Sequence, residues 1–135
     1  MTLEEQTRAD LIKYRLEQAR ETIEVVDLLL KNDKLSTAVN RIYYGMYYSI
    51  LALALQNNFE TSKHQQLIGW FNKEFIRNGL IEKEYGRMLR DAFENRTYGD
   101  YDSFVVFDKD SVLIFYSEMK DFIEKIEAYI CASME

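Results

Sequence analysis

The sequence predicts an all-α fold, an up-down antiparallel helical bundle of about five helices. The chain of 135 residues contains no proline and only five glycines, so almost nothing interrupts long helices. Apolar residues recur at helical spacing through most of the chain. With 47% hydrophobic and 30% charged residues, the composition is that of a globular protein. The length suits one domain, residues 1–135, with a single core.

Five segments show this helical spacing between turn signals. They are residues 3 to about 31, about 37 to 56, about 62 to 78, about 82 to 96, and 112 to about 132. Residues 97–108 are expected to form a loop, which makes Arg96 the last residue of the fourth helix. Several connections are short, which favours antiparallel neighbours. The long first and last helices could pair as the outer wall of the bundle.

Candidate N-caps have a side-chain oxygen that can accept a hydrogen bond from a backbone N–H of the first helical turn. They are Thr2 with Glu5, Ser36 or Thr37, Ser62 with Gln65, and Asp108 or Asp110. Each of these sets lies at the start of one of the expected helices. Four of the five helices therefore have a side chain that could fix where they begin.

The acidic composition limits the range of partners. The formal net charge is −6 at pH 7, whereas nonspecific binding along duplex DNA depends on many Lys and Arg contacts to phosphates. We therefore expect no duplex DNA partner, and any nucleic-acid contact should be local. Residues 42–59 carry no charge, but their strongly apolar part is shorter than the span of about 20 residues that a membrane helix needs. No membrane partner is expected.

Metal and redox chemistry have little support in the composition. Cys131 is the only cysteine and His64 the only histidine, so neither a disulfide framework nor a zinc cluster is expected. We expect no metal and no cofactor, and a cytoplasmic location, because the acidic N-terminus lacks the pattern of a signal peptide. Glycine-loop NTPase, HExxH and nucleophile-elbow patterns are also absent from the sequence.

The second expected helix has more apolar residues than one core face requires. Such a surplus indicates that a second subunit covers part of the helix. Homodimerisation is therefore the working hypothesis for the assembly of the chain.

The same helix carries an arginine beside an aromatic run. Arg41, Tyr44 and Tyr48 fall at i, i+3 and i+7 and share one face. A guanidinium flanked by tyrosine rings and hydroxyls can hold a phosphate or stack a base, so these are candidate nucleotide- or RNA-binding residues. The alternative is packing, because tyrosines at helical spacing are usually core or interface residues.

A second group of candidates begins at Arg96, with Asp100 at i+4 and Tyr101 at i+5. A phosphate-binding arginine usually needs a carboxylate to fix its geometry, so these three are candidate catalytic residues. The alternative is a helix-end charge paired with its own loop carboxylate. His64, in the first turn of the third helix, is a candidate nucleotide- or RNA-binding residue or base, since a helix N-terminus favours the neutral ring. Alternatively, His64 only starts the helix or packs.

Three short segments together carry a resemblance to a known family. They are Asn40-Arg41-Ile42-Tyr43-Tyr44 with Tyr47, Ser62-Lys63-His64, and Arg96 through Asp100-Tyr101. Over roughly residues 10–130 the chain resembles the HEPN family (higher eukaryotes and prokaryotes nucleotide-binding), in particular its small stand-alone prokaryotic branch. The resemblance implies one HEPN-like helical domain, a homodimer with a cleft between protomers, and often a metal-independent RNA-cleaving toxin whose antitoxin is a small nucleotidyltransferase.

By this resemblance Arg96 is the phosphate-binding arginine, whereas the family's histidine a few positions further on is missing and Tyr101 stands near its place. A phenol with a pKa of about 10 is a poor general base at neutral pH. Three functions stay open: a nucleotide- or RNA-binding, toxin-like ribonuclease; a non-catalytic module that binds a nucleotidyltransferase or is modified by it at Tyr98 or Tyr101; and a helical dimer in which the motifs only support packing.

Overall fold

The computed structural model describes residues 1–102 and 104–134. Their helices are α1 (Leu3–Lys31), α2 (Leu35–Gln56), α3 (His64–Phe71), the π-helical turn η1 (Asn72–Ile76), α4 (Lys83–Tyr101) and α5 (Lys109–Ser133). No strand occurs within these described ranges. The prediction of an all-α bundle of five helices is confirmed.

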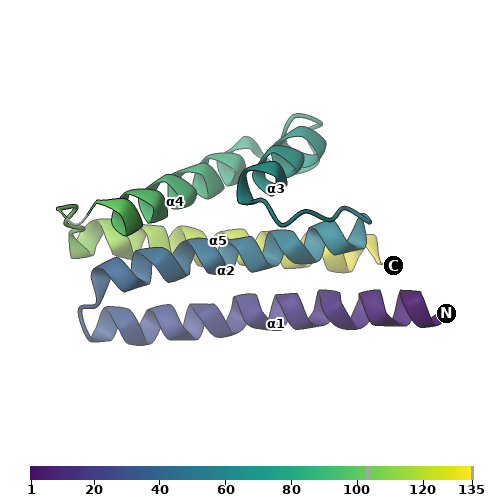
Figure 1. Ribbon diagram of the computed structural model, residues 1–135, viewed down its shortest axis with the longest axis horizontal. Helices are drawn as coiled ribbons and strands as arrows, with labels where there is room; N and C mark the ends of the chain where they lie inside the picture. Colours follow the sequence, from purple (N-terminus) through teal and green to yellow (C-terminus); the bar gives the residue numbers. More distant parts are fainter. Residues whose placement is uncertain (103, 135) are drawn as a thin grey trace.

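Helix α2 is the central element of the bundle. It contacts α1, α5, α4 and α3, and Figure 1 shows it lying lengthwise between α1 and α4. Its inward side chains are buried within the one chain, among them Ile42, Tyr43, Met46, Ile50 and Leu53. The apolar density of α2 thus has an explanation inside a single protomer. Homodimerisation stays a prediction.

The first helix begins as predicted, because Thr2 and Glu5 form a reciprocal capping box. It also contacts α5, as expected for the two longest helices: Arg20 pairs with Glu127 across them. None of the described helices combines the length and the hydropathy that a bilayer span requires.

The start of α2 differs from the prediction that Ser36 or Thr37 caps it. The helix begins at Leu35, and its N-cap, Lys34, makes no side-chain capping bond. Asp33 takes a left-handed conformation with φ 55°, and the backbone N–H of the next residue donates to the carbonyl of Leu29 over 2.9 Å. This tight, backbone-closed turn starts α2 before either hydroxyl residue is reached.

Helix α3 also lacks the predicted cap. It begins at His64 with Lys63 as N-cap, and Ser62 caps nothing. Instead the Thr61 hydroxyl accepts a hydrogen bond of 3.2 Å from the Lys63 backbone N–H. This local turn makes His64 the first residue of the helix and confirms its place in the first turn.

The predicted third helix is not regular along its whole length. After Phe71 it widens into η1, where the Arg77 N–H donates to the carbonyl of Asn72 over 2.9 Å, an i to i+5 bond. The π-helical turn ends at Ile76, and a turn over residues 77–79 follows, close to the predicted end near residue 78. Gly79 has φ +72°, which a glycine adopts without the steric cost of a Cβ atom.

The largest difference concerns the end of α4. The helix runs on to Tyr101, so Arg96 lies within it and the predicted loop after residue 96 is wrong for residues 97–101. Gly99 lies within the part of α4 that was predicted to be loop. Gly99 lies against the Phe107 ring, where an added Cβ would be 3.2 Å from Cε2. Close packing therefore explains this glycine, and Asp108 then caps α5, as one of its two predicted caps.

Candidate functional site

The site begins with the residues that the first turns of α2 align. Arg41 and Tyr44 are one turn apart, and the Arg41 guanidinium carbon lies 4.6 Å from the centre of the Tyr44 ring. Tyr48 follows on the same face, with its ring centre 6.3 Å from that of Tyr44. The three predicted residues of this face are thus adjacent, and each of them is only partly buried.

Helix α4 brings Arg96 to the same place. Arg96 Nη2 donates a hydrogen bond of 2.9 Å to the Tyr44 hydroxyl, and its guanidinium carbon lies 5.3 Å from the centre of that ring. Asp100 lies one turn further along α4, with Oδ2 3.0 Å from Arg96 Nε. The extra turns of α4 are what place this carboxylate beside the arginine.

The contact between Arg96 and Asp100 is an ion pair rather than an aligned hydrogen bond. The Arg96 Nε atom is buried and has no hydrogen-bond partner among the described residues, although the carboxylate oxygen is close. The Arg96 side chain as a whole keeps 19% of its surface exposed. The guanidinium is therefore held in place by the charge of Asp100, by the Tyr44 hydroxyl and by the tyrosine rings.

Asn40 is a member of the site to which the sequence assigned no role. Its amide Nδ2 donates to both oxygens of Asp100, over 3.3 and 3.4 Å. Its Oδ1 accepts from Arg41 Nε and Nη2, over 3.0 and 2.9 Å. The amide therefore connects Arg41 to the carboxylate that pairs with Arg96. Only its place next to Arg41 in the sequence hints at this link, since Asp100 is 60 residues away.

His64 joins the cluster from the start of α3. Its ring stacks on that of Tyr47 with centres 4.2 Å apart and planes 7° apart. The Tyr43 hydroxyl and His64 Nδ1 lie 2.7 Å apart in a hydrogen bond. Tyr44 approaches the imidazole edge-on, with ring centres 5.8 Å apart. The structure thus brings His64 into contact with the tyrosines that surround Arg96.

The protonation of this pair follows from its surroundings. Burial, and to a lesser extent the positive charge of Arg96, lowers the pKa of His64. Burial raises the pKa of Tyr43, so its phenol stays protonated. Both groups are neutral near pH 7. When Nδ1–H of His64 donates to the Tyr43 oxygen, Nε2 is left as a proton acceptor.

Tyr101 is not part of the cluster. It is the last residue of α4 and is 82% exposed. Among the described residues no group of three or more His, Cys, Asp or Glu side chains is arranged to hold a metal ion. The side chains gathered at the site are therefore two arginines, one carboxylate, one amide, tyrosines and a neutral histidine.

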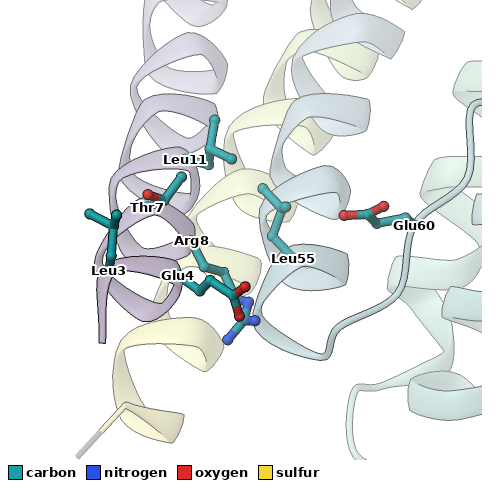
Figure 2. Close-up of a pocket in the computed structure, with 7 residues that line it drawn as sticks. All are labelled: Leu3, Glu4, Thr7, Arg8, Leu11, Leu55 and Glu60. Carbon is teal, nitrogen blue, oxygen red and sulfur yellow. The ribbon is translucent and has the colours of Figure 1, made fainter. Parts of the chain in front are cut away.

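A separate surface pocket lies between the start of α1 and the end of α2 (Figure 2). Its apolar side is formed by Leu3, Leu11 and Leu55, and its polar side chains are Glu4, Thr7, Arg8 and Glu60. Asn40 and Leu55 are 15 residues apart on α2, which is about 22 Å along a helix. None of the candidate site residues lines this pocket.

The fold and the site together define an all-α protein with two arginines and a carboxylate gathered where α2 and α4 meet. The family model of the HEPN domain matches residues 12–129. The chain belongs to the HEPN family. The match covers the residues of the site on α2, α3 and α4, from Asn40 to Asp100.

Similar proteins occur in Thermotoga maritima and Methanocaldococcus jannaschii. A UPF0332 protein of Thermotoga maritima is 39% identical over 122 residues, which is 90% of this chain and 87% of that protein. Two proteins of Methanocaldococcus jannaschii, both named "Putative toxin", are 30% and 28% identical. The first match covers 86% of each chain, and the second covers 85% of this chain and 78% of the relative. The recognition of the family from three short motifs is thus confirmed.

Proposed function

We propose that this HEPN protein binds the phosphates of RNA or of a nucleotide at Arg96 and acts as a toxin-like ribonuclease. The observation that carries the proposal is the setting of Arg96, which lies 3.0 Å from Asp100 and 2.9 Å from the Tyr44 hydroxyl while 19% of its side chain stays exposed. Such an arginine is oriented for an oxyanion and still accessible to it. The names of the two archaeal relatives support the toxin-like assignment.

The neighbouring groups fit RNA cleavage that needs no metal ion. In this reaction the ribose 2′-oxygen attacks phosphorus, its proton passes to a base, and the bond to the 5′-oxygen breaks as that oxygen takes a proton from water. His64, neutral near pH 7 because its pKa is lowered, is the proposed base at Nε2. Arg96 would stabilise the negative charge that develops on the phosphorane. The products would carry a 2′,3′-cyclic phosphate and a 5′-hydroxyl.

A second candidate function follows from the exposed end of α4. Tyr98 and Tyr101 are 60% and 82% exposed, and Tyr101 stands near the place of the missing family histidine. A non-catalytic module that pairs with a small nucleotidyltransferase, and accepts a nucleotide on one of these phenols, would need such accessible hydroxyls. Incubation with the nucleotidyltransferase and a nucleoside triphosphate, followed by mass spectrometry of wild type, Tyr98→Phe and Tyr101→Phe, tests this function.

The first experiment is cleavage of a mixed cellular RNA pool in EDTA. Wild type is compared with Arg96→Ala, His64→Ala and, as a control, Arg90→Ala, whose side chain lies outside the site and is 61% exposed. Loss of cleavage in the two site variants, with full activity in the control, is the expected result. RNA that stays intact with wild type, together with unchanged RNA binding by Arg96→Ala, would overturn the proposal.

We further propose that the protein acts as a cytoplasmic homodimer. The support is the apolar surface that the single chain leaves exposed, including Leu28 at 61%, Ile114 at 60% and Val106 at 91%. Light scattering after size exclusion measures the mass directly, and a single protomer of 16.1 kDa at micromolar concentration would contradict this.

A further inference from the structure

Asn40 links the two arginines of the site, because it bonds directly to Arg41 and reaches Arg96 through Asp100. Its amide oxygen accepts from Arg41, and its amide nitrogen donates to Asp100, which pairs with Arg96. Aspartate in this position would keep the acceptor but lose the donor, and alanine would lose both. The amide is thus suited to hold Arg41 and Asp100 in place together.

The two guanidinium groups are close enough to meet one compact ligand. The guanidinium carbons of Arg41 and Arg96 lie 4.6 and 5.3 Å from the centre of the same Tyr44 ring, so their separation cannot exceed the sum of these distances. The Nη1 atom of each has no hydrogen-bond partner among the described residues. Among the described residues Asp100 is the one carboxylate bonded in this network, so the two arginines keep one net positive charge, although the protein as a whole is acidic.

We propose that Asn40 is a positioning residue that holds Arg41 and Arg96 as a paired site for two neighbouring phosphate groups. This inference rests on the proposed function, because it assigns the ligand of the same site. Each arginine presents a planar fork of N–H donors to one phosphate, and a two-point ligand fixes the register of the bound chain or nucleotide. Two consecutive RNA phosphates and the diphosphate of a nucleotide share this chemistry.

Binding assays with simple probes test the ligand class. The probes are inorganic phosphate, pyrophosphate, and a short oligouridylate with a 5′-hydroxyl, which carries only internal phosphates. We expect at least one of the two-phosphate probes to bind roughly tenfold more tightly than inorganic phosphate, since it engages a second arginine. Preference for pyrophosphate would identify a nucleotide diphosphate, and preference for the oligouridylate would identify an RNA strand. Equal affinity for all three probes would overturn the paired site.

Variants of Asn40 test the positioning role with the better probe. Asn40→Ala and Asn40→Asp are expected to weaken binding by about tenfold, as loss of a residue that orients a ligand-binding group typically does. The matched controls are Asn78→Ala and Asn78→Asp, which change an exposed asparagine that donates to the Glu74 carbonyl far from the arginines. The controls carry the same changes of size and charge and should keep wild-type affinity.

A double-mutant cycle separates positioning from general damage. If Asn40 acts by holding the arginines, the loss of affinity in Asn40→Ala/Arg41→Ala should be smaller than the sum of the losses in the two single variants, whereas independent effects would add. Thermal melting first shows that each variant is folded, and Asn40→Asp provides a variant of nearly unchanged shape. Additive losses, or wild-type affinity in both Asn40 variants, would overturn the positioning role.

The outcomes also distinguish this inference from the proposed function. If Arg96→Ala binds the probes as well as wild type, the proposed function fails and the paired site fails with it. If Arg96→Ala loses binding while Asn40→Ala, Asn40→Asp and Arg41→Ala retain it, the proposed function stands and only the paired site is overturned.

Discussion

Arg96 Nη2 donates a hydrogen bond of 2.9 Å to the Tyr44 hydroxyl and thereby joins α4 to α2 across 52 residues of sequence. Tyr44→Phe removes the acceptor and keeps the aromatic ring. We expect the free energy of unfolding to fall by about 1 kcal/mol, because a hydrogen bond from a charged group is lost but the partly exposed guanidinium can turn to water. Urea unfolding of the two proteins measures this difference.

Tyr48→Phe is the matched control for this prediction. Tyr48 is also half-buried on α2, but its hydroxyl makes no hydrogen bond among the described residues. The control should leave the free energy of unfolding almost unchanged. Equal losses in the two variants would show that the Arg96 contact contributes nothing specific to stability.

The proposed RNA contacts predict a change in salt dependence. The logarithm of the binding constant for single-stranded RNA should fall with the logarithm of salt concentration, with a slope of roughly 0.7 for each phosphate contact. Arg96→Ala and Arg41→Ala should each reduce the slope by about this amount. Arg8→Ala, in the pocket of Figure 2, should leave it unchanged. Identical slopes for all four proteins would argue against phosphate contacts at the site.

Gly45 lies in the core, where α2 approaches its neighbours closely, and the packing there predicts the effect of a substitution. A Cβ atom there would lie 2.2 Å from the Met119 methyl carbon and 3.2 Å from Thr22 Cγ2. Met119 is fully buried, so its methyl group has little room to move. We expect Gly45→Ala to lower the free energy of unfolding by about 1–3 kcal/mol, as overpacking in a core does.

Gly69→Ala should have the opposite effect on stability, because Gly69 is exposed on its helix. An added Cβ at Gly69 meets nothing within 4 Å, and alanine has the higher helix propensity. The free energy of unfolding of this variant should rise by about 0.5–1 kcal/mol. Thermal melting of Gly45→Ala and Gly69→Ala measures both changes in stability. Stabilisation by Gly45→Ala would mean that α1, α2 and α5 pack less tightly than the structure shows.

The features of the fold and of the site that the sequence predicted correctly depend on residues that are close in sequence. The capping box of Thr2 and Glu5 and the cap at Asp108 depend on partners three residues away, and both are present. The helical face of Arg41 and Tyr44 likewise follows from spacing alone. Such relations can be recognised without any knowledge of the tertiary fold.

The features that the sequence did not predict depend on contacts between different segments of the chain. The loop predicted after Arg96 is helical as far as Tyr101, and within this extension Gly99 packs against the Phe107 ring. The bond between Asn40 and Asp100 spans 60 residues, and the stacking of His64 on Tyr47 depends on the path of the loop before α3. No spacing rule contains these relations, because they are set by how the helices pack.

His64 predicts a pH dependence of stability whose sign follows from its lowered pKa. Burial chiefly, and the charge of Arg96 next, disfavours the imidazolium in the folded protein. As the pH falls below the ordinary histidine pKa of about 6.5, the unfolded chain takes up the proton before the folded one does. Folding therefore loses free energy with falling pH until His64 is protonated in the folded state as well.

The difference in unfolding free energy between wild type and His64→Gln isolates this effect, because both proteins share all other titrating groups. Between about pH 8 and pH 7 the difference should be constant, and from about pH 6.5 down to pH 5 wild type should lose stability relative to the variant. Urea unfolding across this range measures it. A difference that stays flat, or that grows in favour of wild type at low pH, would mean that His64 accepts a proton as readily in the folded protein as in the unfolded chain. The neutral ring required of the proposed base would then have no support from its surroundings.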